Sequence, residues 1–384
     1  MNSPIYLDYA ATTPVDDAVA EEMLLHLSGK GNFGNPSSQH SFGQRAEKAV
    51  ENARALIADF LNGKARDIVF TSGATESNNI AIKGVARANR VKGHHLITAV
   101  TEHKAVLDTC RALEHEGFDV TYLTPTDTGL ISPDQLAQAI RPDTILVSLM
   151  HVNNETGVIQ DIAALGNVVK QHGIIFHVDA SQSFGKLPID LDTFPVDLLS
   201  CSSHKLYGPK GMGFLYIRNR PKTRITPLVD GGKQEYRIRP GTLPTHQITG
   251  LGKAVEIAHN RMDKDRETTS TINRILRQGL TRIEGVTFNS LPQALPNIIN
   301  ISFDGIDSVT LVTSLQNDVA ISSGSACTSG SIEPSHVLRG MGIEGDRLQS
   351  AVRISFGRYT TQEEIKMALD KIANEVIRIR NHLN

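Results

Sequence analysis

The chain has 384 residues, of which 40% are hydrophobic and 21% are charged, as is typical of a soluble globular protein with a large core. The 39 Lys and Arg residues nearly balance the 41 Asp and Glu residues, so the net charge of −2 gives no reason to expect direct binding to nucleic acid or to a membrane. Three scattered cysteines exclude a disulfide framework, and the first residues lack the pattern of a signal peptide, so we expect a cytoplasmic protein.

Short apolar runs alternate with amphipathic stretches from about residue 45 to residue 217. The apolar runs predict seven strands, at residues 67–71, 95–99, 120–123, 145–149, 174–178, 198–202 and 213–217. Helical periodicity between them predicts helices at residues 43–61, 76–90, 105–116, 133–140 and 162–172. This alternation is typical of an α/β fold with a mostly parallel, right-handed sheet.

The pattern changes near residue 250. A long helix with a polar face, either continuous or broken, is predicted at residues 249–279. Shorter strands at 286–289, 298–303 and 352–356 follow, and a last helix begins at Glu363. We therefore expect a large domain at residues 15–250 and a smaller α+β domain formed by residues 1–14 and 251–384.

A lysine directly follows the strand predicted at 198–202. The sequence Ser202-Ser203-His204-Lys205 brings an amine and hydroxyl donors to the edge where open α/β sheets bind ligands. Lysine forms Schiff bases with carbonyl cofactors, and pyridoxal phosphate needs such a lysine beside phosphate donors. A solvated lysine at the end of a strand is the alternative.

Two further strand ends carry groups that suit the same cofactor. After the strand at 67–71, Gly73 permits a tight turn and Thr75 lies near the start of a helix, which makes a phosphate cradle. Asp179 follows the strand at 174–178, where a buried carboxylate needs a partner such as a pyridinium nitrogen. An ordinary capped helix and a turn-capping carboxylate are the respective alternatives.

Other polar residues are predicted at the same edge. His103 follows the strand at 95–99, where it could stack on a planar ring, act as an acid or base, or only cap a helix. Asn154 follows the strand at 145–149, and its amide could bind a substrate carboxylate or a ring oxygen. Arg353 lies inside an apolar strand, where it would bind a substrate carboxylate or form a structural salt bridge.

Cys327 lies in a segment of small residues, 321–331, which predicts a mobile, exposed loop. A cysteine in such a loop is interpreted as a reactive thiol, whereas Cys110 and Cys201 fall on helix and strand patterns and are expected to be structural. The fourteen histidines are scattered and form no metal-binding motif, so no metal site is predicted.

Together these motifs resemble the cysteine desulfurases of the NifS/IscS-like group, within the class V, fold-type I pyridoxal-phosphate enzymes. The matching segments run from end to end of the chain: residues 6–14, 34–38, 73–77, 101–103, 151–155, 202–205 and 322–327. The resemblance implies a large domain with a mostly parallel seven-stranded sheet, a smaller domain that carries the cysteine loop at about 321–332, and a homodimer.

The resemblance also implies a role for each matching residue. Lys205 would carry pyridoxal 5'-phosphate and move the Cα proton, and Cys327 would take the sulfur of L-cysteine as a persulfide, releasing L-alanine. The other implied contacts are Asp179 to the pyridine nitrogen, His103 stacked on the ring, Gln182 to the ring oxygen, Ala74, Thr75, Ser202 and His204 around the phosphate, Thr242 from a second subunit, and Asn154, Arg353 and Asn35 near the substrate carboxylate.

The sulfur acceptor is left open. Housekeeping members of the group usually continue into a C-terminal extension that docks an iron–sulfur scaffold, and this sequence ends at Asn384, shortly after its last predicted helix. Supply of sulfur to iron–sulfur clusters, to tRNA thiolation or to DNA phosphorothioation would all fit. A selenocysteine lyase or class V aminotransferase on the same fold is one alternative function, and a catalytically inactive partner of a sulfur-transfer complex is another.

Overall fold

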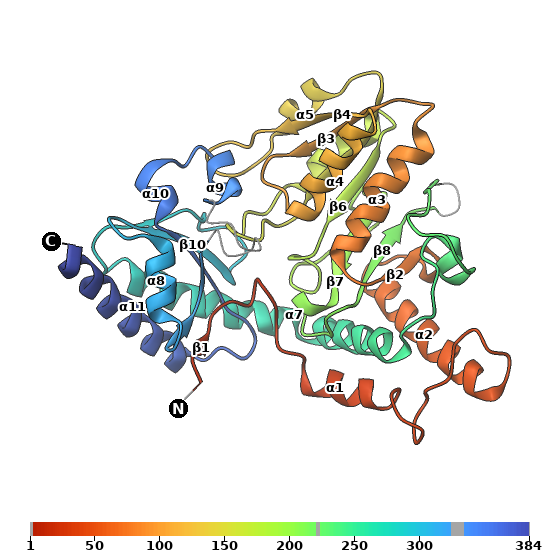
Figure 1. Cartoon of the computed structure of the whole chain (residues 1–384), viewed down its shortest axis with the longest axis horizontal. Helices are drawn as coiled ribbons and strands as arrows, with labels where there is room; N and C mark the ends of the chain where they lie inside the picture. The colour runs from red at the N-terminus through yellow and green to blue at the C-terminus, as the bar shows by residue number, and fades with distance from the viewer. Residues whose placement is uncertain (1–2, 220–222, 324–333, 384) are drawn as a thin grey trace.

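The computed structural model describes residues 3–219, 223–323 and 334–383, and its centre is a seven-stranded sheet (Figure 1). The strands of this sheet are, in chain order, β2 (Ile68–Thr71), β3 (His95–Ala99), β4 (Asp119–Leu123), β5 (Thr144–Met150), β6 (Ile175–Asp179), β7 (Leu198–Ser202) and β8 (Gly213–Ile217). Each lies within two residues of its predicted position, because each is a short, fully apolar or alternating run bounded by polar residues.

The spatial order of the sheet is β2-β8-β7-β6-β5-β3-β4. Every neighbouring pair from β7 to β4 is parallel, and only β8 runs against its neighbours β7 and β2. The prediction of a mostly parallel sheet is therefore confirmed. Because β2 runs in the same direction as β7, the carboxyl ends of β2, β7, β6, β5 and β3 all meet at one edge.

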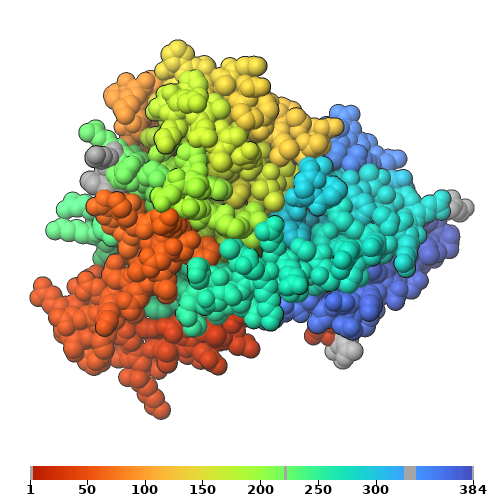
Figure 2. Space-filling model, turned by 180° about the vertical axis from the view of Figure 1, so that it is seen from behind, coloured from red at the N-terminus to blue at the C-terminus, as the bar shows by residue number. Residues whose placement is uncertain are grey.

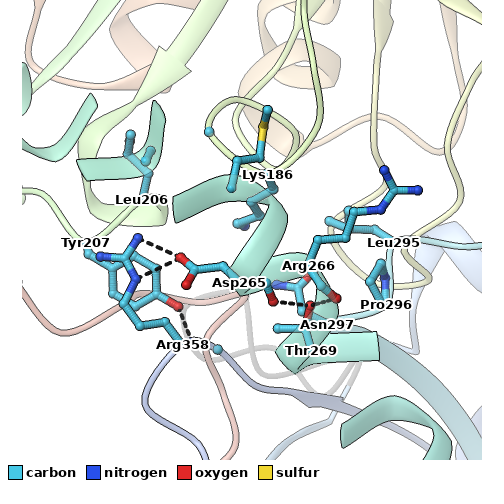
Figure 3. Close-up of a pocket in the computed structure, with 14 residues that line it drawn as sticks. Lys186, Leu206, Tyr207, Asp265, Arg266, Thr269, Leu295, Pro296, Asn297 and Arg358 are labelled. Atoms are coloured by element: carbon cyan, nitrogen blue, oxygen red, sulfur yellow. Dashed lines mark hydrogen bonds and ion pairs between the residues drawn. The ribbon is translucent and has the colours of Figure 1, made fainter. Parts of the chain in front are cut away.

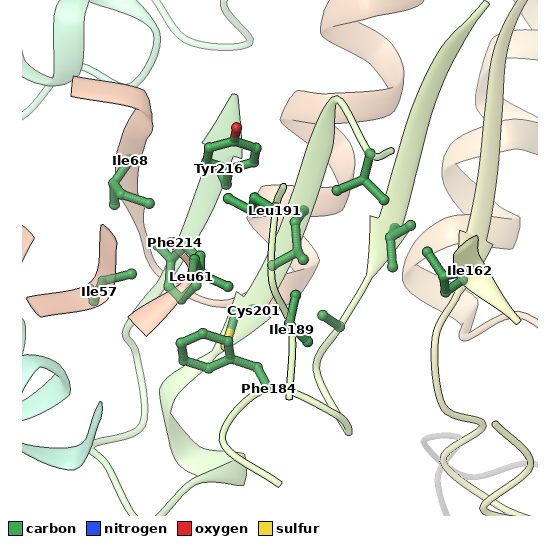
Figure 4. Close-up of a cluster of buried hydrophobic side chains, with 14 of the residues drawn as sticks. Ile57, Leu61, Ile68, Ile162, Phe184, Ile189, Leu191, Cys201, Phe214 and Tyr216 are labelled. Atoms are coloured by element: carbon green, nitrogen blue, oxygen red, sulfur yellow. The ribbon is translucent and has the colours of Figure 1, made fainter. Parts of the chain in front are cut away.

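Helices cover both faces of this sheet. Side chains alternate between the faces, so that Ile68 and Phe70 of β2 enter one core while Val69 enters the other. The first core lies under helices α2, α5, α6 and the first half of α7, and Figure 4 shows part of it around Phe184 and Phe214. The second core lies under α3 and α4. The helices are α1 (Asp17–Leu24), α2 (Ser41–Phe60), α3 (Ala74–Asn89), α4 (Lys104–His115), α5 (Pro133–Ala139), α6 (Ile162–Gln171) and α7 (Thr245–Leu280).

A second body is built around a four-stranded antiparallel sheet with the order β12-β13-β10-β9. Its own core includes apolar residues of the second half of α7 and of α11. The N-terminal strand β1 (Ile5–Tyr6) pairs with β11 (Val319–Ala320) beside it. The other elements are β9 (Val286–Phe288), β10 (Ile298–Phe303), α8 (Ser308–Leu315), β12 (Ser322–Ser323), α9 (His336–Gly340), α10 (Gly345–Gln349), β13 (Ala351–Ser355) and α11 (Gln362–Leu383).

Helix α7 joins the two bodies. It is a single helix of 36 residues, which settles the choice between a continuous and a broken helix. Viewed from behind in Figure 2, α7 (teal) lies between the N-terminal residues (red to yellow) and the C-terminal residues (blue). Since α7 contributes to both cores, the domain boundary at residue 250 stays a prediction.

One prediction needs correction. Ser322 and Ser323, expected to be part of an exposed loop, form strand β12 and are buried against Arg353 and Val352 of β13. Two-residue strands carry no sequence periodicity, so their pairing is decided by the neighbouring strand. Residues 324–333, including Cys327, lie outside the described part of the chain.

Candidate active site

A cavity of about 700 Å³ opens where the carboxyl ends of the parallel strands meet. This is the edge at which open α/β sheets bind ligands. Most of the residues predicted from sequence line this one cavity: Ala74, Thr75, His103, Asn154, Asp179, Gln182, Ser202, His204, Lys205 and Arg353.

Lys205 ends the short 3-10 helix η2 (Ser203–Lys205), which directly follows β7. Its Nζ donates hydrogen bonds to the backbone carbonyls of Ala10 and Ala11, at 2.5 and 2.7 Å. The N-terminal segment therefore crosses over the lysine and holds it at the cavity wall. A solvated lysine, the alternative from sequence, does not describe this amine.

One end of the cavity is built for an anion. Helix α3 begins there after Gly73, whose φ of 146° is strained for any other residue, and the first N–H groups of a helix have no intrahelical acceptor. The backbone is also close-packed, because a Cβ at Gly213 would lie 2.7 Å from the Cα of Gly73. Lys210 lines the same cavity. Burial is the main reason that the pKa of His204 is lowered to about 4, and repulsion from Lys205, Lys210 and Lys186 adds to the shift.

The opposite charge is supplied by Asp179, at the end of β6. Its Oδ2 accepts a hydrogen bond from Asn78 Nδ2 at 2.8 Å, and its Oδ1 accepts from the backbone N–H and the hydroxyl of Ser181. Asn78 and Ser181 were missed from sequence. Asn78 lies one helical turn beyond Thr75 on α3, and that spacing could have indicated it.

His103 is the N-cap residue of α4. Its Nδ1 accepts the N–H of Ala105 at 3.1 Å, so the hydrogen of the neutral ring is on Nε2. Burial is the main reason that the pKa of His103 is lowered, which favours this neutral form. The histidine therefore both caps its helix and lines the cavity, two roles that sequence reasoning offered as alternatives.

Arg353 of β13 enters the cavity from the second body. Its Nη1 donates to the backbone carbonyl of Asn154 at 2.9 Å, and its Nη2 pairs with Asp8 Oδ1 at 2.8 Å. The salt bridge that was the alternative from sequence is thus present, with the guanidinium still facing the cavity. Asp8, which sequence reasoning missed, lies 345 positions away along the chain.

Two predicted residues, Thr242 and Asn35, do not line this cavity. Thr242 lines a separate recess of about 160 Å³ together with Ser72 and Gly211. Asn35 is exposed and its side chain accepts the N–H of Ser37, away from the cavity of its own chain. Cys327 falls outside the described residues, but β12, which ends four residues before it, contributes Ser322 to the cavity wall.

The two cysteines that the structure describes, Cys110 and Cys201, are buried and unpaired, as predicted. Burial raises the pKa of Cys110 to about 12, which makes its thiol unreactive. No cluster of metal-binding side chains occurs in residues 3–219, 223–323 and 334–383. Within the same ranges, every helix is too short or too polar to cross a bilayer.

The family model described as aminotransferase class-V matches residues 5–367. A curated relative, the cysteine desulfurase IscS of Klebsiella pneumoniae subsp. pneumoniae, is 53% identical over 382 residues, which is 99% of this chain and 94% of the relative. This chain belongs to the cysteine desulfurases of the class-V aminotransferase family. Its cofactor is pyridoxal 5'-phosphate, as throughout the family, and the resemblance seen in the sequence is confirmed.

Solved structures agree with this assignment. A NifS-like protein superposes with a TM-score of 0.90 at 36% identity, covering 97% of this chain and 98% of the other. A structure titled SspA in complex with cysteine superposes with a TM-score of 0.84 at 44% identity, covering 93% and 100%. The predicted fold-type I architecture is therefore confirmed for this desulfurase.

Proposed function

We propose that the desulfurase holds pyridoxal 5'-phosphate in the cavity of about 700 Å³ and uses Cys327 to accept sulfur from L-cysteine. The observation that carries this proposal is the gathering of an amine, a carboxylate and an anion-binding helix start in one cavity. When bound, the cofactor supplies an electron sink for negative charge at the substrate Cα.

The donor set fits the cofactor. Lys205 would hold it covalently, and Asp179 at the other end would keep its ring nitrogen protonated. The phosphate would lie at the start of α3, bound by the backbone of Ala74, by Thr75 and by the side chains of Ser202 and His204. His103 would stack on the ring, and Gln182 would donate to the ring oxygen.

The substrate would be oriented by Arg353 and Asn154. A guanidinium binds a carboxylate through two parallel N–H groups, and this one is already held in place by Asp8 and the Asn154 carbonyl. Lys205 Nζ would remove the proton from the substrate Cα. Cys327 lies four residues after β12, and four residues span at most about 14 Å, so its sulfur can reach the cavity that Ser322 lines.

The transfer of sulfur needs only the Cys327 thiolate and the substrate. The Cys327 thiolate attacks the sulfur of L-cysteine, the bond between that sulfur and Cβ breaks, and its electron pair returns to the substrate carbon. Protonation of the carbon gives L-alanine, and the persulfide stays on Cys327.

A single-turnover assay with L-cysteine tests this function. We expect the visible band of the bound cofactor to shift, one L-alanine to form per site, and Cys327 to gain the mass of one sulfur. Transamination products with an unmodified Cys327 would favour an aminotransferase instead. A protein without any cofactor band would contradict the proposed site.

We further propose a homodimer in which Asn35 and Thr242 serve the cavity of the partner copy. Supporting this, the segment that carries Asn35 exposes large apolar side chains, with exposed fractions of 64% for Leu24, 59% for Leu25 and 53% for Phe33. Mixing Lys205→Ala with Thr242→Val protein tests the arrangement, because only a shared site is restored in the mixed dimer. No recovery of activity would place Thr242 in the site of its own chain.

For the acceptor, we propose a protein of iron–sulfur cluster assembly. The support is the identity of 53% with a relative named IscS over nearly the whole of both chains. Transfer of labelled sulfur from persulfide-loaded protein to an iron–sulfur scaffold, compared with transfer into tRNA or DNA modification, distinguishes the acceptors. The buried, unpaired Cys110 and Cys201 suit a reducing compartment, so we propose a cytoplasmic location.

A further inference from the structure

The side-chain amide of Gln182 is held by two partners of opposite hydrogen-bonding type. Its Nε2 donates to the backbone carbonyl of Ala10 at 2.9 Å, and its Oε1 accepts from Lys186 Nζ at 3.2 Å. The carbonyl can only accept, and an amine N–H donates. A flipped amide would place oxygen against oxygen at Ala10 and NH₂ against the amine at Lys186, so the observed orientation is strongly preferred.

Lys186 lies in unusual surroundings for a cation. It borders a separate, small cavity of about 40 Å³ between the two bodies of the protein, shown in Figure 3. Asp265 lines the same cavity, but its carboxylate is paired with Arg358 Nη2 at 2.8 Å. Within the described ranges, Lys186 forms no ion pair, and its side-chain hydrogen bond goes to Gln182.

Holding a charged amine in this position costs free energy. Burial, with repulsion from Lys205, lowers the pKa of Lys186 to about 7. Lys186 is half-buried, and a partly buried cation without a carboxylate partner costs free energy rather than stabilising the fold. The hydrogen bond of Lys186 instead reaches Gln182, a residue that lines the main cavity.

The orientation of the Gln182 amide decides whether it presents a hydrogen-bond donor or an acceptor to the cavity. Nε2 carries two hydrogens and donates one to the Ala10 carbonyl, so the second can be donated to an acceptor in the cavity. We propose that Lys186 is a positioning residue that acts through Gln182, fixing the amide so that its NH₂ group faces the ring oxygen of the bound cofactor. This inference rests on the proposed function, in which Gln182 contacts that oxygen.

Two variants of matched length separate the donor from the charge. Lys186→Met and Lys186→Gln both remove the cation beside Lys205, but only glutamine still offers an N–H to Gln182 Oε1. The measurements are the dissociation constant of pyridoxal phosphate, by equilibrium dialysis of the apoprotein, and the absorption maximum of the bound cofactor. Thermal unfolding of each apoprotein reports any general loss of structure.

We expect Lys186→Met to weaken cofactor binding about tenfold and to shift the absorption maximum, and Lys186→Gln to stay within about threefold of wild type. In a Gln182→Met background, Lys186→Met should have no further effect, because the residue it positions is gone. If Lys186→Met does not fold, Lys186→Gln alone tests the inference. A loss of cofactor affinity in Lys186→Gln as large as that in Gln182→Met then overturns it.

Equal losses in the two Lys186 variants, or a Lys186→Met effect that persists without Gln182, would also overturn it. Unchanged binding and spectrum in Lys186→Met would remove this inference and leave the proposed function intact. A wild-type protein that binds no cofactor would instead remove the proposed function.

Discussion

Replacing Glu235 with glutamine tests the ion pair that supports the outer strand of the seven-stranded sheet. Glu235 lies in the 3-10 helix η3 (Gln234–Arg237) and binds Arg54 through both carboxylate oxygens, at 2.7 and 2.9 Å. The side chains of Arg54 and Glu235 are 3% and 1% exposed. Glu235 Oε2 also accepts the backbone N–H of Phe70, in edge strand β2.

The cost of this change follows from the burial of the pair. Removing one partner of a buried ion pair costs about 3–5 kcal/mol, because the other charge stays buried without compensation. Glutamine keeps one oxygen that can accept a hydrogen bond, so we expect a cost at the lower end of this range. Glu235, Tyr236 and Arg237 also have positive φ values of 42°, 58° and 68°, so relaxation of this strained turn offsets part of the loss. We therefore expect a loss of about 3 kcal/mol.

Thermal unfolding of the apoprotein measures the effect. For 384 residues the unfolding entropy is about 0.8 kcal/mol per kelvin, so about 3 kcal/mol lowers Tm by about 4 °C. Glu51→Gln is the matched control, because Glu51 binds the same Arg54 through Nε but is 51% exposed. Its loss should stay below about 1 kcal/mol. Equal Tm shifts in the two variants would refute the assignment of this energy to the buried pair.

Three further outcomes are expected. Cys327→Ser should keep the cofactor band and thermal stability but release no sulfur from L-cysteine, and undiminished sulfide production would contradict the role of this thiol. Gly213→Ala should lower Tm and weaken cofactor binding, because the new Cβ would lie 2.4 Å from the Cys201 carbonyl oxygen, whereas Gly29→Ala, with nothing within 4 Å, should be neutral in both assays. Burial lowers the pKa of His151 to about 4, so on acidification this histidine is protonated in the unfolded chain before it is protonated in the folded protein. The free energy of unfolding therefore falls as the pH drops from about 6.5 towards 4, by up to about 1.4 kcal/mol per pH unit. Denaturant titrations at pH 7.5 and 5 should show a smaller fall for His151→Leu than for wild type, and an equal fall would contradict the shift.

The sequence by itself determined the main sheet and most of the candidate site. Each strand of the sheet is a local apolar run, so residues 198–202 could be recognised without knowledge of their neighbours. Lys205 and Asp179 follow strands directly, and the carboxyl ends of parallel strands meet at one edge. Their common position in the cavity was therefore predictable.

Only the tertiary structure decided how these side chains are held. Asn78 contacts Asp179 across 101 positions of sequence, Ala10 contacts Lys205 across 195, and Asp8 contacts Arg353 across 345. The orientation of the Gln182 amide likewise depends on a hydrogen bond to Ala10, near the N-terminus. Hydrogen bonds between distant residues leave no periodicity or spacing in the chain, because each partner satisfies only the local rules of its own element, and their geometry exists only once the elements have packed.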